Sequence, residues 1–253
     1  MFYEFKNFGS ADYLKKETNV NFSFPKHLHQ CFELIIIKSG TMDVTVDDKC
    51  FTMNKNDAIL IFPNQIHSLS STVSEHILFI FSPFIVNAYY KEISEKIPVN
   101  ALFKLSPDII QILSELDNNS PLIEKKGVLY YVCSMFAREA QYVPRSFKNE
   151  PVYELFSYVE KNYNNICTIQ SAAAVLGYNY GYLSKLFKKT VGMTYNEYVN
   201  LVRLNNACYL MDTTNFTISE SSYLSGYKSL HTFNRNFKAH YGKTPSEYRK
   251  VKA

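Results

Sequence analysis

Three histidines and one glutamate in the first third of the sequence have types and spacings that suit a shared site. His27 and His29 are separated by one residue, Glu33 follows after three more, and His67 closes a Pro-x3-His segment. Three imidazoles and a carboxylate suit a divalent transition metal. They also suit a polar patch that lines a small-molecule pocket, or hydrogen bonds that only support the fold. We expect the pocket, and the other two interpretations stay open.

The residues around this cluster have the pattern of β-structure, from about residue 20 to residue 84. Apolar and polar residues alternate in short runs. Ser39-Gly40 is expected to end the first clear strand, Asp47-Asp48 to form a turn, and Pro63 to stop the last strand. Several short strands separated by such residues predict a β-barrel or jelly roll. The predicted strands cover residues 32–37, 42–47, 50–53 and 58–62.

Helices are expected to follow the barrel and to complete a first domain over residues 1–145. The longest predicted helix is ended by Pro144 and carries apolar residues at helical spacing. A short polar linker over residues 146–151 separates this domain from the rest of the chain. The predicted helices cover residues 83–94, 107–116 and 122–142. The apolar stripe of the longest helix consists of Val128, Tyr131, Val132, Met135, Phe136 and Ala140.

The last hundred residues contain one sequence unit twice, and such self-similarity indicates a supersecondary unit used twice. The two copies match at an offset of 49 residues at first and of 50 from Leu183 and Phe233 onward. One residue is therefore gained in the loop before the second basic helix. The matching pairs include Gly177 and Gly226, Phe187-Lys188 and Phe237-Lys238, Gly192 and Gly242, Thr194 and Thr244, and Glu197-Tyr198 and Glu247-Tyr248.

Each copy has the pattern of a short helix, a glycine-centred turn and a second, basic helix. Asn179 and Ser229 are suited to cap the second helices, which Gly192 and Gly242 would end. Apolar residues occupy one face of each second helix, and basic and polar residues occupy the other. The pattern predicts a helix-turn-helix whose second helix enters a DNA major groove. A plain helical bundle also fits one copy, but two copies with matching caps and terminators favour the helix-turn-helix.

The distribution of charge supports a phosphate-facing second domain. Residues 151–253 carry a net charge of +6 and residues 1–150 a net charge of −2, which together give the overall +4. Basic character confined to one part of a chain is typical of nucleic-acid binding. A helix over residues 194–211, about 27 Å long, would join the two motifs. It would hold their second helices about one duplex turn, about 34 Å, apart.

Residues 152–253 resemble the DNA-binding domain of the AraC/XylS family of bacterial transcription regulators, with two helix-turn-helix motifs at about 169–190 and 218–241. The resemblance implies a cytoplasmic regulator that binds double-stranded DNA and responds to a small-molecule effector. It also implies a homodimer and, for an activator, a contact with RNA polymerase. The helix over residues 122–142 is the candidate dimer surface, although its stripe also fits packing onto its own barrel. One departure is Ser221-Ser222, where the family has an apolar residue followed by Ala. The residues that carry the resemblance are Gly177-Tyr178, the run 182–189, Gly192, Tyr198, Arg203-Leu204, Ala207, Gly226-Tyr227, Phe233-Asn234-Arg235, Phe237-Lys238, Gly242 and the run 244–249.

The resemblance also implies which side chains face DNA. Arg and Lys can reach guanine, and Asn can pair with adenine. Lysines further along the helices are placed for phosphates, although Lys189 also fits a solvated surface position. The predicted base-facing residues are Gly181, Ser184, Lys185, His231, Thr232, Asn234 and Arg235. The predicted phosphate contacts are Lys188, Lys189 and Lys238.

The barrel cluster is similar to the two sequence motifs of cupins, in which two His, a Glu and a later His project into a barrel mouth. The first spacing agrees, through His27, His29 and Glu33 to Gly40. The second departs, because Asn56-Asp57 replaces a usual glycine and Pro63 to His67 is one residue short. The resemblance implies an effector pocket, with a divalent metal as the alternative. No resident cofactor is expected.

Other features of the sequence bear on the class of protein. Five scattered cysteines without a CxxC pair fit a reducing compartment, and neither a signal peptide nor a membrane span is expected. We expect a regulator without catalytic residues. An alternative is a metal-dependent cupin enzyme with a helical appendage, which would need a metal at the cluster. A third class is a constitutive DNA-binding protein without an effector.

Overall fold

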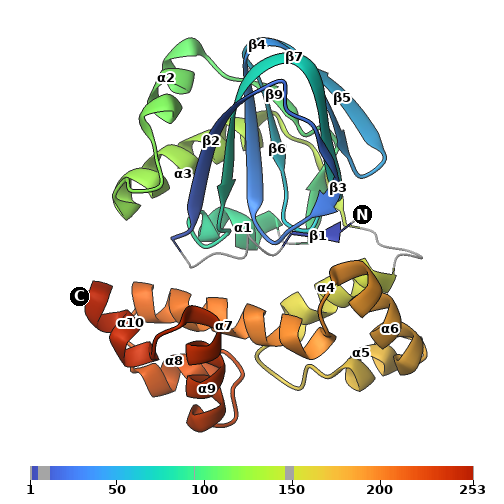
Figure 1. The fold of residues 1–253 in the computed structure, drawn as a ribbon, viewed down its shortest axis with the longest axis vertical. Coiled ribbons are helices and arrows are strands. Elements are labelled where there is room, and N and C mark those ends of the chain that lie inside the picture. Colours follow the sequence, from blue (N-terminus) through green and yellow to red (C-terminus); the bar gives the residue numbers. More distant parts are fainter. Residues whose placement is uncertain (1, 5–11, 94, 146–150, 253) are drawn as a thin grey trace. The chain divides into compact units, whose positions relative to one another are not determined.

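Two long strands, β4 (Phe32–Val46) and β7 (His67–Phe81), lie side by side through the first part of the molecule (Figure 1). The computed structural model describes residues 2–4, 12–93, 95–145 and 151–252. β4 and β7 pair antiparallel from Phe32 opposite Phe81 to Val46 opposite His67. The other strands of this sheet are β1 (Phe2–Tyr3), β2 (Leu14–Val20), β3 (Phe24–Leu28), β5 (Lys49–Met53), β6 (Asp57–Ile61) and β9 (Leu102–Lys104).

Both long strands bend, and each bend divides its strand between two groups of neighbours. The first half of β4 pairs with β6 and with the second half of β7, which also pairs with β2. The second half of β4 pairs with β5 and with the first half of β7, which also pairs with β3. Two half-sheets built from shared strands can therefore fold over a common core, which is the jelly-roll arrangement that the sequence predicts.

Gly40 lies at the bend of β4. Its φ is +74°, and a Cβ atom at this position would lie 2.1 Å from the carbonyl oxygen of Val73 on β7. Only glycine permits so close an approach of two strands at a positive φ. The prediction that Ser39-Gly40 ends a strand is therefore wrong. The glycine bends one continuous strand, whereas the predicted turn at Asp47-Asp48 is confirmed.

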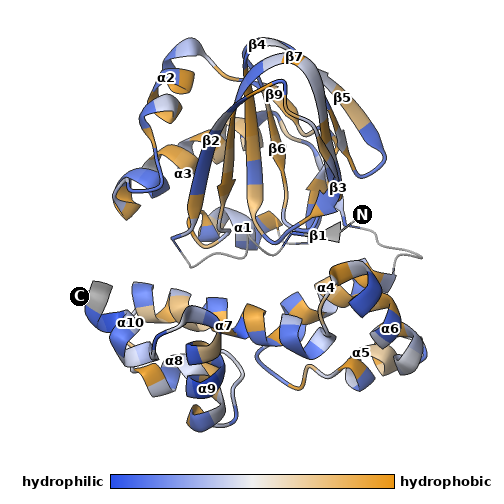
Figure 2. Cartoon of the chain, viewed as in Figure 1, coloured by the Kyte–Doolittle hydropathy of each residue, from blue (hydrophilic) through white to orange (hydrophobic). Residues whose placement is uncertain are grey.

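Successive residues of β4 alternate between two hydrophobic cores. Figure 2 shows hydrophobic residues along the strands of the sheet. Ile35 and Ile37 point into the interior between the half-sheets. Leu34 and Ile36 point to the other face, where the helices pack. The inner core also contains Met42, Val44, Met53, Ile59, Ile61, Leu69, Leu78 and Ile80. Period-two alternation between two apolar cores explains why the run Leu34–Ile37 is hydrophobic without interruption.

Three helices follow the sheet: α1 (Asn87–Ile93), α2 (Pro107–Glu115) and α3 (Leu122–Glu139). The structure differs from the sequence prediction at the end of α3. The helix ends at Glu139, and residues Tyr142–Pro144 form β10, which pairs with β8 (Lys96–Pro98). In the predicted stripe of α3, Val132 and Phe136 pack on the barrel of the same chain, whereas Tyr131 is half exposed. Strand β2 also begins before the predicted barrel region.

The second part of the chain is helical. Its helices are α4 (Pro151–Asn162), α5 (Ile169–Leu176), α6 (Tyr180–Val191), α7 (Tyr195–Thr213), α8 (Ile218–Leu224), α9 (Leu230–Tyr241) and α10 (Pro245–Lys252). Helix α7 extends between one group formed by α4, α5 and α6 and a second group formed by α8, α9 and α10 (Figure 1). The two predicted helix-turn-helix motifs are the pairs α5–α6 and α8–α9.

The sequence repeat is also a repeat of the core. On α6 and α7, Phe187 lies against Tyr198 with ring centroids 5.4 Å apart. At the equivalent positions of the second copy, Phe237 lies against Tyr248 with ring centroids 5.5 Å apart. Asn179 caps α6 through backbone N–H groups of Gly181 and Tyr182. Ser229 occupies the cap position of α9, but its side chain makes no capping hydrogen bond.

The chain separates into two compact units, residues 1–146 and 147–253. The predicted two-domain α+β fold, a β-rich first part and a double helix-turn-helix second part, is confirmed. The predicted linker lies outside the described residues except for Pro151, which begins α4. Among the described helices, none combines the length and the apolar character needed to cross a membrane.

Candidate functional sites

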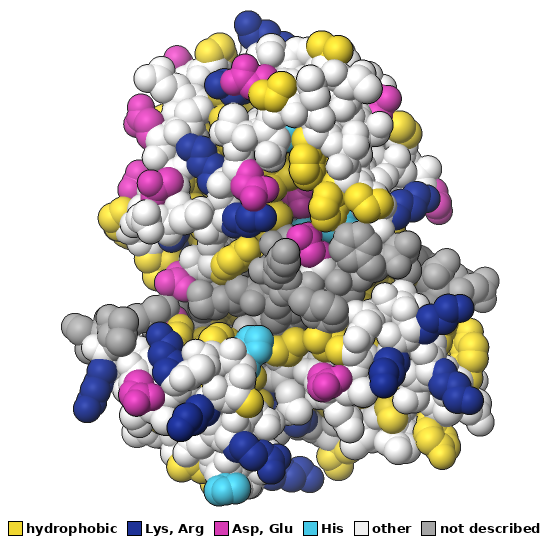
Figure 3. Space-filling view, in the orientation of Figure 1, with side chains coloured by type: hydrophobic (Ala, Val, Ile, Leu, Met, Phe, Trp, Pro, Cys, Tyr) yellow, Lys and Arg dark blue, Asp and Glu magenta, His cyan; other side chains and the backbone are white. Residues whose placement is uncertain are grey.

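Helices α6 and α9 each bury one face and expose the other. Leu183, Phe187 and Val191 of α6 are buried, as are Phe233 and Phe237 of α9. The ten predicted DNA-facing residues all lie outside the core: Gly181 and Thr232 are half-buried, and the other eight are exposed. Figure 3 shows that Lys and Arg outnumber Asp and Glu on the visible face of the helical unit. The structure thus brings the predicted residues onto two accessible helix faces.

The two exposed faces have similar chemistry at equivalent positions. Lys185 of α6 corresponds to Arg235 of α9, and both are exposed cations. Ser184 corresponds to Asn234 one residue earlier. Lys188 and Lys238, one turn further on, both lie in the last turn of their helix. A cation at the centre of the face can reach base edges, and the later lysines can reach phosphates.

Tyr182 is a candidate interface residue that the sequence prediction did not place at a DNA-facing position. Its side chain is 51% exposed. It occupies the position of Thr232, which is predicted to face bases. The offset of the repeat was the signal that could have identified it. An exposed aromatic ring on a polar helix face can contact the methyl group of thymine or a sugar.

The segment between α4 and α5 contacts both α7 and the turn of the second motif. Arg203 of α7 donates hydrogen bonds to the carbonyl oxygens of Tyr163 and Asn165, which follow α4. Gly226, in the turn between α8 and α9, packs on the same segment. A Cβ atom at Gly226 would lie 2.5 Å from the carbonyl oxygen of Tyr163. The turn of the second motif is therefore seated on the segment between α4 and α5, and α4 packs on α6, which restricts the spacing of α6 and α9.

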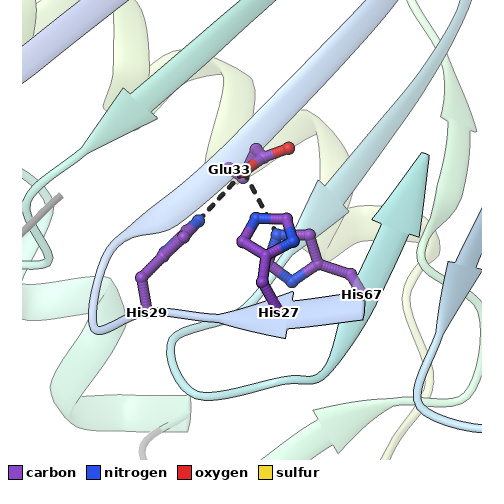
Figure 4. Close-up of side chains that lie close together, drawn as sticks. All are labelled: His27, His29, Glu33 and His67. Atoms are coloured by element: carbon purple, nitrogen blue, oxygen red, sulfur yellow. Dashed lines mark hydrogen bonds and ion pairs between the residues drawn. The ribbon is translucent and has the colours of Figure 1, made fainter. Parts of the chain in front are cut away.

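The second candidate site is the histidine and glutamate cluster of the barrel (Figure 4). His27 is in β3 and His29 follows that strand, while Glu33 is in β4 and His67 begins β7. His27 and His67 are opposite one another in the pairing of β3 with β7. Strand pairing thus brings together residues that are far apart in the sequence. All four residues are buried, with exposures of 1–2%.

Glu33 is the centre of the cluster. Its Oε2 atom lies 2.9 Å from Nε2 of His29 and 3.2 Å from Nε2 of His67. The rings of His27 and His67 are in contact, with centroids 4.0 Å apart. Nε2 of His27 lies 3.7 Å from a carboxylate oxygen of Glu4. The structure therefore assembles all four predicted residues and adds Glu4, which the sequence pattern did not single out.

Each of the three imidazole rings directs its Nδ1 atom at a backbone carbonyl oxygen. Nδ1 of His27 donates to the carbonyl oxygen of Pro25, at 3.0 Å. Nδ1 of His29 donates to the carbonyl of Cys31 and Nδ1 of His67 to that of Gln65. Each Nδ1 therefore carries a proton, because a carbonyl oxygen only accepts. These hydrogen bonds fix the ring orientations.

The surroundings shift the pKa values of Glu33, His67 and His27 in different directions. Burial alone would raise the pKa of Glu33, but the charge of His67 and hydrogen bonds from His29 and His67 outweigh it and hold that pKa well below its ordinary value. Burial alone would lower the pKa of His67, but the attraction of Glu33 raises it. Burial, followed by the charge of His67, lowers the pKa of His27 to about 3. An ionised Glu33 beside a neutral His27 is the expected state near neutral pH.

The two-domain fold and matches to two family models together define a DNA-binding transcription regulator. A family model described as an AraC-like ligand binding domain matches residues 13–121, and one described as a helix-turn-helix domain matches residues 172–251. The chain belongs to the AraC/XylS family of bacterial transcription regulators.

Characterised and uncharacterised regulators are similar to this chain. An uncharacterised regulator of Bacillus subtilis, YisR, is 22% identical over 96% of this chain and 92% of its own. The transcriptional activator AarP of Providencia stuartii is 30% identical over 41% of this chain and 76% of its own. The lactose operon activator of Staphylococcus xylosus is 27% identical over 56% of this chain, which spans 54% of that protein. Among solved structures, ToxT of Vibrio cholerae matches 94% of this chain and 99% of its own at 20% identity and a TM-score of 0.44.

Proposed function

We propose that this protein is a sequence-specific transcription activator whose DNA binding is modulated by a ligand of its N-terminal domain. The observation that carries the proposal is the equivalence of the exposed faces of α6 and α9, each supported by a Phe–Tyr contact at equivalent positions of the repeat. Two such faces at a restricted spacing suit two successive major grooves on one side of a duplex. Activation is supported by relatives that are named activators.

DNA recognition is proposed to divide between specific and general contacts. Arg235 and Lys185 would read guanine, and Asn234 would read adenine. Gly181 offers no side chain, whereas His231 occupies the equivalent position in α9. The second motif would therefore carry more of the specificity. Lys188, Lys189 and Lys238 would contact phosphates and set the strength and salt dependence of binding.

Modulation is proposed to begin at the barrel cluster. The cluster places polar groups beside an aliphatic interior that includes Ile35 and Ile80. A few convergent polar groups next to apolar side chains are typical of small-molecule sites. A ligand bound there changes DNA affinity only if it binds one arrangement of the chain more tightly than another.

A homodimer is proposed to use the exposed side of α3, since the predicted stripe is largely covered by its own barrel. Ile123 is 79% exposed and Tyr131 is 50% exposed. Gly127 lies between them at helical spacing, and a Cβ atom there would meet nothing within 4 Å. These three positions form one accessible stripe on which a second copy can pack. Sedimentation of the full chain and of Ile123→Glu tests this: the variant is expected to be monomeric.

The proposed function is tested by capturing genomic fragments with the purified full chain at physiological salt and sequencing them. We expect a few enriched sites, each with two short blocks about ten base pairs apart. The genes beside these sites would identify the regulated pathway. Retention of fragments without any enriched sequence, with and without cell extract as a source of effector, would contradict specific DNA binding.

A further inference from the structure

We infer that Arg203 is a positioning residue that determines which spacing between two DNA blocks this protein accepts. Arg203 is half-buried near the middle of α7, where it meets residues 163–165 and residues 225–227. We call these three pieces the joint. The inference rests on the proposed function, because it assigns the residue that would hold α6 and α9 in position for two grooves. It goes beyond base reading, since Arg203 lies outside both helix-turn-helix motifs.

Helix α7 changes its packing partners at Arg203. Tyr198, in the first half of the helix, packs on Phe187 of the first motif. Leu204 and Cys208, in the second half, belong to the core of the second motif. Arg203 therefore lies where one core ends and the other begins. Long helices curve and bend, so a helix with a second contact beside it fixes a spacing more firmly than a helix alone.

The guanidinium group of Arg203 bridges two segments that are more than sixty residues apart. Its Nε atom donates to the carbonyl oxygen of Tyr163 at 2.6 Å, and an Nη atom donates to that of Asn165 at 3.0 Å. The centre of the same group lies 6.0 Å from the ring centroid of Tyr227. A planar group with several fixed donors can serve two carbonyls and lie over a ring at once, which an ammonium group cannot do.

A comparison of equivalent glycines shows that the turn itself does not require this contact. Gly177 and Gly226 both have positive φ angles, +76° and +90°. A Cβ atom at Gly177 would meet nothing within 4 Å in the part of the chain that the structure describes. A Cβ atom at Gly226 would lie 2.5 Å from the carbonyl oxygen of Tyr163 and 3.0 Å from Nε of Arg203. Of the two glycines, Gly226 therefore serves the joint in addition to its backbone angle.

The joint is connected to both recognition helices through short pieces of backbone. Residues 225–227 directly precede α9, and residues 163–165 lie between α4, which packs on α6, and α5. The turn is also tied to α7. Nδ2 of Asn206 donates to Oγ of Ser225 at 3.0 Å, and the hydroxyl group of Tyr227 donates to the carbonyl oxygen of Asn200 at 3.3 Å. A displacement at the joint would therefore move α9 relative to α6.

A fixed joint makes binding sensitive to the distance between the two DNA blocks. One inserted base pair moves the second block by about 3.4 Å along the duplex and turns it by about 34°. Two helices that are held at one spacing lose contacts on such a duplex. Helices joined only by α7 can follow the moved block, but they bind the original site less tightly because they are less preorganised.

The experiment measures binding of the purified full chain to a captured site and to the same site with one base pair inserted between the blocks. The natural chain should bind the longer site at least about fivefold more weakly, the lower end of the cost of one lost base contact. Arg203→Ala and Gly226→Ala should lose this preference. Both should bind a duplex with a single block as the natural chain does, which a general loss of folding would not allow.

Two matched controls separate the joint from other effects. Gly177→Ala introduces a side chain at the same positive φ but away from the joint. Arg249→Ala removes another arginine that donates to a backbone carbonyl, that of Phe216, in a contact beside the second motif. Both controls should keep the spacing preference of the natural chain.

Three results would overturn the inference. They are equal binding of both spacings by the natural chain, an unchanged preference in folded Arg203→Ala, and loss of the preference in the two controls. Capture of genomic fragments distinguishes these from failure of the proposed function. Enriched sites with an unchanged preference in Arg203→Ala contradict only the role of Arg203, whereas the absence of enriched sites contradicts sequence-specific binding and this inference together.

Discussion

Lys185 of α6 and Arg235 of α9 occupy the same position in the two helix-turn-helix motifs, fifty residues apart, and both side chains are exposed. Each lies two residues before a buried phenylalanine that packs on a tyrosine of the following helix. The two positions are equivalent in the sequence repeat and in the packing beneath them. Each cation therefore projects from a helix face that is held by the same kind of Phe–Tyr contact. Predictions for DNA binding follow from this relationship.

Replacing Arg235 with Ala should reduce sequence discrimination. Loss of a bidentate contact to guanine costs about 1–3 kcal/mol, or about 5- to 150-fold in affinity for the specific site. Binding to competitor DNA should change much less. Competition titrations measure both affinities, and Lys250→Ala removes one exposed charge from α10 as a control. Full discrimination by Arg235→Ala would show that α9 is not placed in a groove as proposed.

Replacing Lys238 with Ala should weaken binding to all DNA by a similar factor. Each phosphate contact contributes about 0.9 to the slope of log affinity against log salt concentration. The slope should therefore fall by about one unit, while the preference for the specific site is kept. Binding measured over a series of salt concentrations checks this. An unchanged slope would place Lys238 away from the backbone.

Replacing Ser221 and Ser222 with Ala should stabilise the second motif. Both residues are fully buried, and no hydrogen bond of either hydroxyl is described. The equivalent residues of the first motif are Ala172 and Ala173, so alanine fits this packing. Removal of each unpaired hydroxyl should raise the free energy of unfolding by up to about 1 kcal/mol, and the Tm by about 4 °C or more per kcal/mol.

Ser225→Ala is the matched control, because this buried hydroxyl is paired. It donates to the carbonyl oxygen of Ser221 and accepts from Asn206. Its removal leaves Asn206 without this partner and should lower the Tm. If the alanines at 221 and 222 lower the Tm as Ser225→Ala does, their hydroxyls make stabilising contacts and the assignment is wrong.

Acid should destabilise the helical domain through three capping boxes. Hydrogen bonds from the capping threonines hold the pKa values of Glu197, Glu220 and Glu247 below the ordinary 4.5. A lowered folded-state pKa stabilises the fold above the unfolded value, and that stability is lost as the pH falls through the folded value. Urea unfolding of the full chain at about pH 6 and about pH 3.5 should show this loss. The triple Glu→Gln variant should lose less stability, because glutamine caps without titrating. An equal loss would contradict a role of these carboxylates.

The sequence was most informative where the signal is local. Asn179 and Gly192 set the limits of α6 through capping and a left-handed terminus, and both features are decided within a few residues. The end of α3 was less predictable, because Tyr142 leaves the helix to pair with β8, more than forty residues earlier. The role of Gly40 depends on Val73, a contact that only the folded sheet creates.

In the candidate sites, too, local features could be predicted from the sequence and contacts between distant segments could not. The cluster could be assembled from the spacing of His27, His29 and Glu33, but the approach of Glu4 required the structure. The orientation of the three rings toward backbone carbonyls also depends on the exact strand ends, which the sequence predicts only to within a few residues. Tyr182, in contrast, could have been identified from the sequence repeat alone, because it is equivalent to Thr232.

The central claim is that one chain reads two major grooves through α6 and α9 held at a restricted spacing. It is tested most directly by inserting five base pairs between the two blocks of a captured site, which turns the second block to the opposite side of the duplex. Affinity for the altered site should fall to that of competitor DNA, as measured by competition titration. Unchanged affinity after the insertion would contradict simultaneous reading by the two motifs.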